Sequence, residues 1–323
     1  MNKPPFTYTA SMVDLLSEIT FLLGKVETKG IQIPGPILRK SNTIKTVQAT
    51  LAIEGNTLTE GQITSIIEGK KVKGNPNEIL EVQNAIKLYE SLDEYTYTEP
   101  KDLLRAHSLL MKGLVENPGK FRSKNVGILK GEKVVHTAPQ AKLVPKLIAE
   151  HFEWLSENKE VHPIILSCIT HYEIEFIHPF MDGNGRIGRF WQALILNHVN
   201  PAFRYIPIES IIKSQQDLYY KSLESSDKAG ESTPFIEFSL KTLKTGLEEF
   251  IDSFPDVNNT LERRFDLARS IFKTNLFSRK EYMKAMPEIS TATASRDLTG
   301  WCERGDLKKE GSHNQTKYRF SNT

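Results

Sequence analysis

The chain has 323 residues, enough for about two or three domains, and a formal net charge of +2. A charge this close to balance does not by itself indicate a nucleic-acid-binding protein. The two cysteines fall in helix-like apolar stretches, so they predict buried thiols in a reducing compartment and not a disulfide framework. The N-terminus lacks the apolar core of a signal peptide, and no apolar run approaches the ~20 residues of a membrane helix. We therefore expect a cytoplasmic protein with no membrane contact.

The N-terminal region predicts two helices separated by an extended segment that contains prolines. Apolar spacing indicates the first helix over residues 12–25 and the second over about residues 38–53. Gly55 then ends the second helix in the left-handed conformation that glycine adopts cheaply. Glu54 lies just before it, near the negative end of the helix dipole, where an acid is disfavoured. That position hints that Glu54 has a partner elsewhere, although a solvated carboxylate also explains it.

The middle of the chain predicts further helices at residues 59–67, 77–92 and 100–114, with Thr59 and Asn77 as N-caps. Residues 125–137 then change to two short apolar runs around a Lys-Gly-Glu turn, a pattern typical of a β-hairpin. A hairpin inside a helical chain is expected to be an appendage and not part of the core.

The most informative stretch runs from residue 171 to residue 189 and reads HYEIEFIHPFMDGNGRIGR. Apolar spacing before it predicts a helix that ends at His178, because Pro179 cannot continue it. A second helix begins around residues 183–185, so unpaired backbone N–H groups and the positive end of its dipole point outward. Such a helix start is an anion site, and Arg186 and Arg189, three positions apart, can bind phosphate oxygens.

Two residues of this stretch have side chains suited to metal binding and to proton transfer. Asp182 can hold a Mg²⁺ ion that bridges phosphate oxygens, and a neutral His178 can take a proton from a hydroxyl group at cell pH. Two other interpretations are a solvated glycine-rich loop and a metal site made of His171, Glu175 and His178 on one helix face. The metal site would leave the arginines and glycines unexplained, and a chance loop would not fix so many positions. The favoured interpretation is phosphate chemistry beside a general base.

The string HPFMDGNGRIGR closely resembles the signature of the Fic family, HPFx(D/E)GN(G/K)RxxR, and matches it at every fixed position. Fic proteins are helical enzymes, most of which transfer AMP from ATP to a hydroxyl side chain of a target protein. The resemblance implies that His178 is the catalytic base and Asp182 the Mg²⁺ ligand. It also implies a nucleotide-binding run that consists of Gly183, Asn184, Gly185, Arg186, Ile187, Gly188 and Arg189.

The resemblance extends to the N-terminal region, where TLAIEG fits the (S/T)xxxE(G/N) inhibitory motif of many Fic proteins. It implies that Glu54 pairs with Arg189 and stands where the ATP γ-phosphate should go, so that the enzyme inhibits itself. It also implies that residues 125–137 form a flap that aligns a target segment by strand pairing. The candidates for nucleotide contact within this flap are Val135, His136 and Thr137, and a purely structural hairpin is the alternative.

Residues 211–226 predict a helix that contains two adjacent tyrosines, Tyr219 and Tyr220. By helical periodicity, one of them belongs to the core and the other to the surface. Fic proteins carry a similar segment whose first tyrosine packs near the adenine. The resemblance therefore makes Tyr219 a candidate purine neighbour and Asp227 a polar candidate for nucleotide contact.

The C-terminal region predicts a separate domain after an interruption at residues 253–259. Helices are expected at residues 261–272, 278–286 and 291–303, followed by a hairpin with Gly311 near its tip. Three helices and a two-stranded wing resemble a winged helix-turn-helix domain. Residues 279–319 contain nine Lys or Arg against six Asp or Glu, too small an excess to establish DNA contact. Protein contact or scaffolding is favoured, and DNA contact is left open.

The whole sequence therefore predicts a mainly α-helical protein with a Fic core, a small β-hairpin flap and a winged helix-turn-helix domain. The predicted divisions are an N-terminal region with the inhibitory helix at 1–95, the catalytic core at 96–252 and the winged helix at 258–323. The predicted reaction is AMP transfer from Mg·ATP to a Ser, Thr or Tyr hydroxyl group, inhibited by Glu54. The alternatives are removal of AMP, transfer of a different nucleotide, and a transcription regulator whose Fic core senses nucleotide. The target protein and homo-oligomer formation are left open.

Overall fold

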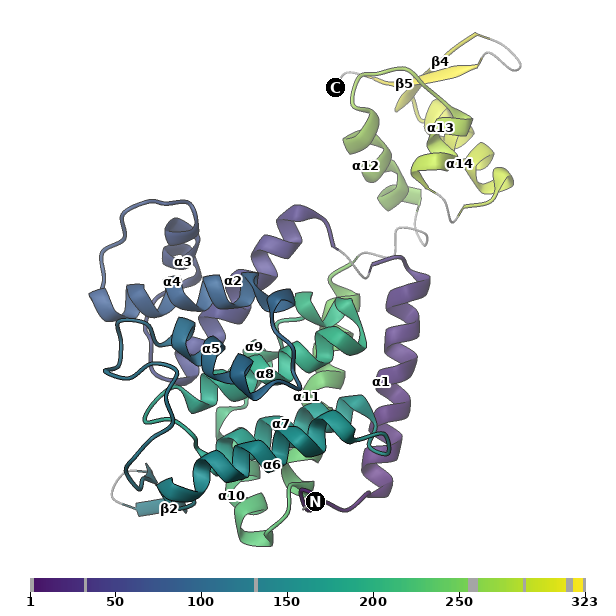
Figure 1. Ribbon diagram of the computed structural model, residues 1–323. Coiled ribbons are helices and arrows are strands. Elements are labelled where there is room, and N and C mark those ends of the chain that lie inside the picture. Colours follow the sequence, from purple (N-terminus) through teal and green to yellow (C-terminus); the bar gives the residue numbers. More distant parts are fainter. Residues whose placement is uncertain are drawn as a thin grey trace. The chain divides into compact units, whose positions relative to one another are not determined.

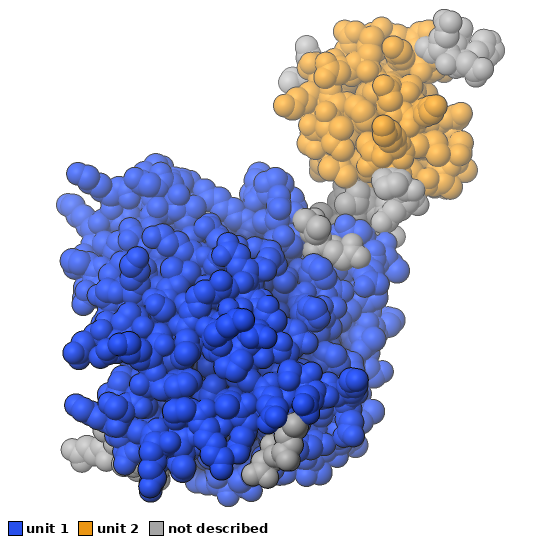
Figure 2. Space-filling model, in the orientation of Figure 1, with its two compact units in different colours: residues 1–251 blue, residues 252–323 orange. Residues whose placement is uncertain are grey.

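The computed structural model describes residues 3–31, 34–130, 133–254, 261–286, 289–311 and 316–321, apart from the side chains of residues 128–137 and 263. Contacts divide the chain into two compact units, Met1–Ile251 and Asp252–Thr323, which are coloured separately in Figure 2. The boundary falls just before the interruption that the sequence predicts. Residues 1–95 belong to the first unit, so the division of that unit into a regulatory region and a catalytic core stays a prediction.

Among the described residues, unit 1 is helical apart from one β-hairpin (Figure 1). Its α-helices are α1 (Ala10–Thr28), α2 (Pro36–Ile53), α3 (Glu60–Ile67), α4 (Pro76–Glu90), α5 (Pro100–Leu110), α6 (Val144–Glu157), α7 (Pro163–Ile177), α8 (Asn184–Val199), α9 (Ile208–Ser214), α10 (Gln216–Ala229) and α11 (Thr233–Asp252). Short 3-10 helices join them at η1 (Leu92–Glu94), η2 (Ala141–Leu143) and η3 (Pro201–Tyr205). Strand β1 (Gly127–Lys130) pairs antiparallel with β2 (Lys133–Thr137). No helix in the described part of the chain has the length and apolar character needed to span a bilayer.

Local sequence determines where several of these helices begin. Thr59 caps α3 as predicted, because its hydroxyl accepts the Gln62 N–H while the Gln62 side chain accepts the Thr59 N–H. The predicted start of α4 is wrong by two residues. Asn75 is the N-cap and Pro76 opens the helix, since proline fits a first turn that needs no N–H donor. The helix predicted over residues 211–226 is interrupted at Gln215, where α9 ends and α10 begins.

Helices α7 and α8 pack against each other at the centre of the hydrophobic core of unit 1. The motif loop at residues 178–183 joins them. Most side chains of α7 are buried. Gly188 of α8 permits a close approach, because a Cβ atom there would lie 2.8 Å from Cδ2 of His171. Helix α1 runs along the outside of the unit in Figure 1, where Glu18 pairs with Lys244 of α11 at 2.8 Å. The buried helix pair thus fixes both ends of the loop that carries the motif.

Unit 2 contains the three helices and the terminal hairpin that the sequence predicts, together with one short additional strand. Its elements are α12 (Leu261–Phe272), β3 (Phe277–Ser278), α13 (Arg279–Ala285), α14 (Thr291–Glu303), β4 (Leu307–Glu310) and β5 (Lys317–Phe320). The strands form an antiparallel sheet in the order β3-β5-β4. Inside the unit, Arg264 of α12 donates to both oxygens of Asp297 of α14 at 2.6 and 2.7 Å. The hydroxyl of Tyr282 donates to the same carboxylate at 2.8 Å, so this buried charge pair sets how three helices meet.

Candidate functional site

A cavity of about 440 Å³ lies where α7 ends and α8 begins. Helices α7, α8 and α10, the motif loop and the turn after α2 supply its lining, which consists of Glu54, Tyr172, Glu175, Phe176, His178, Met181, Asp182, Gly183, Asn184, Gly185, Arg189, Tyr219, Tyr220, Leu223, Glu224 and Asp227. Most of the site residues predicted from the sequence therefore come together here. They include the histidine, the aspartate, the first glycines of α8, one arginine and Glu54.

His178 is the residue at which α7 ends, and its backbone is left-handed, with φ of 50° and ψ of 60°. This conformation turns the chain sharply out of the helix and leaves the His178 side chain at the cavity wall. Its Nδ1 lies 3.4 Å from the carbonyl oxygen of Glu175. A carbonyl can only accept, so this contact favours a proton on Nδ1 and a lone pair on Nε2. An imidazole in that tautomer can accept a proton from a hydroxyl group.

Buried polar side chains hold the loop at residues 178–183. The Asn184 side chain accepts the Phe180 N–H at 2.9 Å and donates to the Phe180 carbonyl at 3.0 Å. His107 of α5 stacks on the Phe180 ring with centroids 3.6 Å apart. The N–H of Gly119 donates to Nδ1 of His107 at 2.8 Å, so the ring proton is on Nε2 and donates to the Asp182 carbonyl at 2.9 Å. Burial lowers the pKa of His107 to about 4, and the ring is therefore neutral at pH 7.

The first turn of α8 has the form of an anion site. Gly183 is the N-cap with φ of 85°, and an added Cβ atom there would lie 2.8 Å from Sδ of Met111. A Cβ atom on Gly185 would lie 2.7 Å from Oε1 of Glu54 and 3.1 Å from Nη1 of Arg189. Charged groups thus approach the backbone closely where N–H groups and the positive end of the helix dipole point outward.

Asp182 and Arg186 bond to each other at the edge of this site. Oδ1 of Asp182 accepts the Gly183 N–H at 2.6 Å and Nη2 of Arg186 at 2.9 Å. Nη1 of Arg186 donates to Oε1 of Glu81, on α4, at 3.0 Å. The Asp182 side chain is 59% exposed, whereas that of Arg186 is 4% exposed. A ligand entering the cavity would therefore meet the carboxylate of Asp182 first, with Arg186 behind it.

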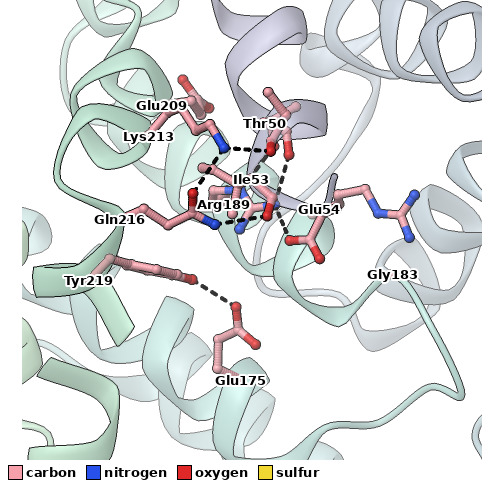
Figure 3. A network of polar contacts seen from close by, with 12 residues as sticks. Thr50, Ile53, Glu54, Glu175, Gly183, Arg189, Glu209, Lys213, Gln216 and Tyr219 are labelled. Carbon is pink, nitrogen blue, oxygen red and sulfur yellow. Dashed lines mark hydrogen bonds and ion pairs between the residues drawn. The ribbon is translucent and has the colours of Figure 1, made fainter. Parts of the chain in front are cut away.

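Arg189 is buried, and its guanidinium meets the C-terminal end of α2 (Figure 3). Its Nη2 donates to Oε1 of Glu54 at 2.6 Å and to the Thr50 carbonyl at 3.1 Å, while its Nε donates to the Thr50 hydroxyl at 2.9 Å. Burial opposes the positive charge, but the carboxylate of Glu54 raises the pKa of Arg189 above its ordinary value. Two sequence motifs separated by more than a hundred residues thus meet in one ion pair.

The turn that carries Glu54 is attached to its surroundings by several hydrogen bonds. Nζ of Lys213 donates to the Ala52 carbonyl at 2.7 Å, and Nε2 of Gln216 donates to the Ile53 carbonyl at 3.0 Å. Both acceptors are carbonyl groups at the C-terminal end of α2, and that of Ala52 also accepts the Gly55 N–H at 3.2 Å. The left-handed end predicted at Gly55 is confirmed by its φ of 95°.

On the opposite side of the same turn, the Asn56 side chain donates to Oε2 of Glu81 at 2.8 Å. The carboxylate of Glu78 accepts the Thr57 N–H at 2.8 Å and the Thr57 hydroxyl at 3.1 Å. Glu81 therefore bonds both to the turn and to Arg186, whereas Glu78 bonds to the turn through Thr57.

Some predicted nucleotide-binding residues do not line the cavity. Ile187 is fully buried, and Gly188 packs against His171 of α7. Arg186 is held behind the wall by Glu81 and Asp182. The side chains of Val135, His136 and Thr137 lie outside the described residues, so their predicted contacts stay predictions. Their backbone forms strand β2.

Sequence reasoning named Asp227 of α10 but missed three other residues of this helix that line the cavity, namely Tyr220, Leu223 and Glu224. With Asp227 they follow the spacing i, i+3, i+4 and i+7, and this spacing was the signal that could have found them. Tyr219 is the core tyrosine of the pair, 1% exposed, and its hydroxyl donates to Oε1 of Glu175 at 2.8 Å. Tyr220 is 39% exposed and offers the larger accessible aromatic surface.

The alternative metal site on α7 does not form. No group of three metal-ligating side chains that could hold an ion occurs among the residues that the structure describes. Nδ1 of His171 is 2.8 Å from Oε1 of Gln192, and its Nε2 is 3.2 Å from the Tyr219 hydroxyl. Burial lowers the pKa of His171 to about 3, so it is a neutral core residue.

Comparison with known proteins agrees with the family that the motif indicates. A family model described as Fic/DOC family matches residues 97–196. The crystal structure of a Fic family protein from Desulfovibrio desulfuricans G20 is 39% identical, with a TM-score of 0.76, and the match covers 100% of this chain and 99% of that chain. This chain belongs to the Fic family.

More distant relatives share part of their length with this chain. The proteins named protein adenylyltransferase Fic from Drosophila mojavensis and Drosophila ananassae are each 29% identical over 230 residues, which is 68% of this chain. The match spans 43% and 44% of those two proteins, so this chain corresponds to less than half of each. Fic-1 from C. elegans is 21% identical over 75% of this chain and 71% of that chain, with a TM-score of 0.60, and supports the fold alone.

Proposed function

We propose that this protein is a protein adenylyltransferase, which transfers AMP from ATP to a Ser, Thr or Tyr hydroxyl group of a target protein. The observation that carries the proposal is the cavity that collects a histidine, an exposed carboxylate, a glycine-containing helix start and a buried arginine. Its volume of about 440 Å³ falls within the range of small-ligand sites. The names of the Drosophila relatives support the same activity.

In the proposed reaction, Nε2 of His178 takes the proton of the target hydroxyl while that oxygen attacks the α-phosphorus of ATP. The new P–O bond forms as the bond to the departing pyrophosphate breaks. The N–H groups at the start of α8, residues 183–185, receive phosphate oxygens, and Arg186 and Arg189 bind the phosphate charge. Fixed donors of this kind usually supply the largest share of catalysis.

Asp182 is the proposed ligand of Mg²⁺. An exposed carboxylate beside a phosphate site fits this ion, because Mg²⁺ keeps several waters and takes one or two carboxylates together with substrate phosphates. When bound, the ion neutralises phosphate charge. Asp182 would hold the ion with a carboxylate whose Oδ1 also accepts from Nη2 of Arg186 at 2.9 Å.

We also propose that α2 inhibits the enzyme through Glu54. Its carboxylate lies at the cavity wall and bonds to Nη2 of Arg189 at 2.6 Å, so it competes with the γ-phosphate for this arginine. ATP bound without this contact is not aligned for attack at its α-phosphorus. Glu54 could also orient a water molecule, and removal of AMP from a modified target is therefore the second candidate activity of the same site.

The hairpin β1–β2 is the proposed docking flap for the target protein. Its backbone can add a further strand from an extended target segment, a mode of recognition that depends little on side chains. We keep Val135, His136 and Thr137 as the candidate nucleotide contacts of this flap. The target hydroxyl would then be presented beside His178.

Unit 2 is proposed to be a winged helix-turn-helix domain. Its order of elements and its three-stranded sheet support this assignment, with α14 in the place of the recognition helix and β4–β5 as the wing. Exposed basic residues on the wing are Lys308, Lys309, Lys317 and Arg319. The modest charge excess favours protein contact over DNA contact, and retained binding to duplex DNA at physiological salt would reverse that preference.

The cytoplasmic location and homo-oligomer formation stay predictions.

Label transfer from ATP radiolabelled at the α-phosphate tests the proposed activity. The experiment compares the wild-type protein, Glu54→Gly, and the double variant Glu54→Gly/His178→Ala. We expect label on protein with Glu54→Gly, much less with the wild type, and none with the double variant. Absence of label in all three proteins, with nucleotide binding intact, would reject AMP transfer. Equal labelling by the wild type and Glu54→Gly would reject the inhibitory role of Glu54.

A further inference from the structure

Arg122 lies in the irregular segment between α5 and β1 and is 3% exposed. Its guanidinium donates to backbone carbonyl groups from two parts of the chain. Nε donates to the His178 carbonyl at 2.7 Å, and Nη1 donates to the Lys124 carbonyl at 2.9 Å. Nη2 donates to the carbonyls of Ile177, at 3.3 Å, and of Pro139. A buried side chain thus contacts both the end of α7 and the segment that follows the hairpin.

The acceptors at the end of α7 explain why a positive charge is stable there. Ile177 and His178 carry carbonyl groups that the helix leaves without an i+4 partner, and the dipole makes this end negative. The planar guanidinium reaches both carbonyls at once, which a lysine ammonium on a flexible stem does not reproduce. The backbone N–H of Arg122 adds a bond to the Pro179 carbonyl at 2.9 Å.

The conformation of His178 needs such support. A non-glycine residue in the left-handed region is strained, and such strain persists where the surroundings fix the backbone. His178 has φ of 50° and ψ of 60°, and Arg122 bonds to the carbonyl of His178 and to that of the next residue. The direction of the imidazole follows from this backbone, so Arg122 acts on the proton acceptor without touching the reacting atoms.

The other end of the contact lies at the hairpin. Pro139, whose carbonyl accepts from Arg122, comes two residues after the last residue of β2. Asn125, which precedes β1, accepts the Ala141 N–H through its side-chain oxygen at 2.8 Å. Both ends of the hairpin are therefore attached near Arg122. One side chain connects the loop that carries the base to the element proposed to present the target hydroxyl.

We propose that Arg122 is a positioning residue that sets the His178 imidazole at its distance from the target hydroxyl. This inference rests on the proposed transfer reaction. It predicts a defect in the transfer step that is separate from nucleotide binding, because the hydrogen bonds of Arg122 within the described part of the chain go to the end of α7, the motif loop and the hairpin ends. A misplacement of about 1 Å between reacting groups lowers a rate about a hundredfold.

The test uses the full chain with Glu54→Gly, so that transfer is measurable, and adds Arg122→Lys or Arg122→Gln. Arg204→Lys is the matched control, because Arg204 lies in η3, is not among the residues that line the cavity, and also donates to a backbone carbonyl, that of Glu90. We expect Arg122→Lys to lower kcat by about ten- to a hundredfold while the Kd for ATP changes less than twofold. Arg204→Lys should leave both values unchanged. Rates are expressed per nucleotide-binding site, which removes the contribution of unfolded protein.

A second readout does not need activity. The ring signal of His178 in protein labelled with ¹³C-histidine, assigned with His178→Ala, should shift or broaden in Arg122→Lys, while the signal of buried His151 stays unchanged. If Glu54→Gly alone transfers no AMP, the proposed function fails, and this signal still decides the role of Arg122. An unchanged His178 signal and kcat would overturn the inference. The inference would also be overturned, in favour of a purely structural role, if transfer and ATP binding were lost equally. Unfolding of both Arg122 variants would have the same meaning.

Discussion

The loop that carries His178 and the turn that carries Glu54 both follow a helix through a left-handed residue, yet they are held in different ways. The φ angles are 50° at His178 and 95° at Gly55. The loop is fixed by buried side chains, namely those of His107, Arg122 and Asn184, each 3% exposed or less. The turn has buried contacts through Arg189 and Asn56, but its other side-chain bonds come from half-buried residues, which include Lys213, Gln216 and Glu78.

If Glu54 inhibits the enzyme as proposed, this difference separates the permanent geometry of the base from a reversible control. Water can replace a hydrogen bond made by a half-buried side chain at little cost, whereas a buried polar group left without a partner costs about 1–3 kcal/mol. The turn with Glu54 can therefore detach while the loop with His178 keeps its shape. Local openings of this kind are expected where few buried contacts hold a segment. The site is built so that activation need not disturb the base.

The largest effect is expected from a change that weakens the support of the loop that carries His178. His107→Asn removes the ring stacked on Phe180 and shortens the donor to the Asp182 carbonyl. In a chain that also carries Glu54→Gly, we expect AMP transfer to fall about a hundredfold. His151→Asn is the matched control, because His151 is a buried histidine on α6 that does not line the cavity. An equal loss of transfer in both variants would show that the effect is general destabilisation.

The buried His107 also makes the stability of the fold depend on pH. Burial lowers the pKa of His107 to about 4 from an ordinary value near ~6.5. Between these pH values the unfolded chain binds more protons than the folded chain, so stability is highest above about pH 6.5 and falls as the pH drops toward 4. Urea unfolding over this range should show a shallower loss in His107→Asn than in the wild type. A parallel pair of curves would contradict the neutral, buried state of His107.

The loop and the turn could be predicted from sequence because each is a contiguous motif, but the residues that hold them could not. His107, Arg122 and Lys213 come from distant segments, and each is a single polar residue in an ordinary helix or loop pattern. A lone histidine or arginine carries no signal of the carbonyl that it will meet. The helices themselves were predictable from apolar spacing, whereas the interruption at Gln215 was not.

The two arginines of the motif also show what the sequence alone cannot predict. Their spacing of three residues predicts one shared face of α8, and both were expected to bind phosphate. In the structure Arg189 lines the cavity, whereas Arg186 is bonded to Glu81 of α4. Sequence spacing places residues relative to their own helix. It cannot tell which carboxylate another helix brings beside them.

A smaller effect is expected from loosening the turn that carries Glu54. Lys213→Met removes the charge that bonds to the Ala52 carbonyl at the negative end of α2. Such an interaction is worth about 0.3–1 kcal/mol, so we expect transfer by the otherwise wild-type protein to rise about two- to fivefold. Lys221→Met, at an exposed position of α10, is the control for loss of charge. No rise, or the same rise in both variants, would contradict a role of Lys213 in holding the inhibitory turn.

The smallest effect should come from Glu81, which bonds to the turn and, through Arg186, is linked to Asp182 of the loop. Glu81 accepts Arg186 through Oε1 and Asn56 through Oε2, whereas Glu78, three residues away on α4, bonds to the turn through Thr57. Glu81→Gln removes the negative charge that competes with phosphate for Arg186, so we expect the Kd for ATP to fall about twofold, as for a partly exposed ion pair. Glu78→Gln should leave this Kd unchanged.

The contrast between these two glutamates tells how nucleotide binding reaches the turn. If only Glu81→Gln tightens ATP binding, the competition takes place at Arg186, and phosphate that captures this arginine also weakens the hold of Glu81 on Asn56. ATP would then loosen the turn that inhibits its own use. If both variants tighten binding equally, the effect passes through the turn alone, and Arg186 belongs with the permanent part of the site. Titration of each variant with ATP, in the presence of Glu54, distinguishes the two arrangements.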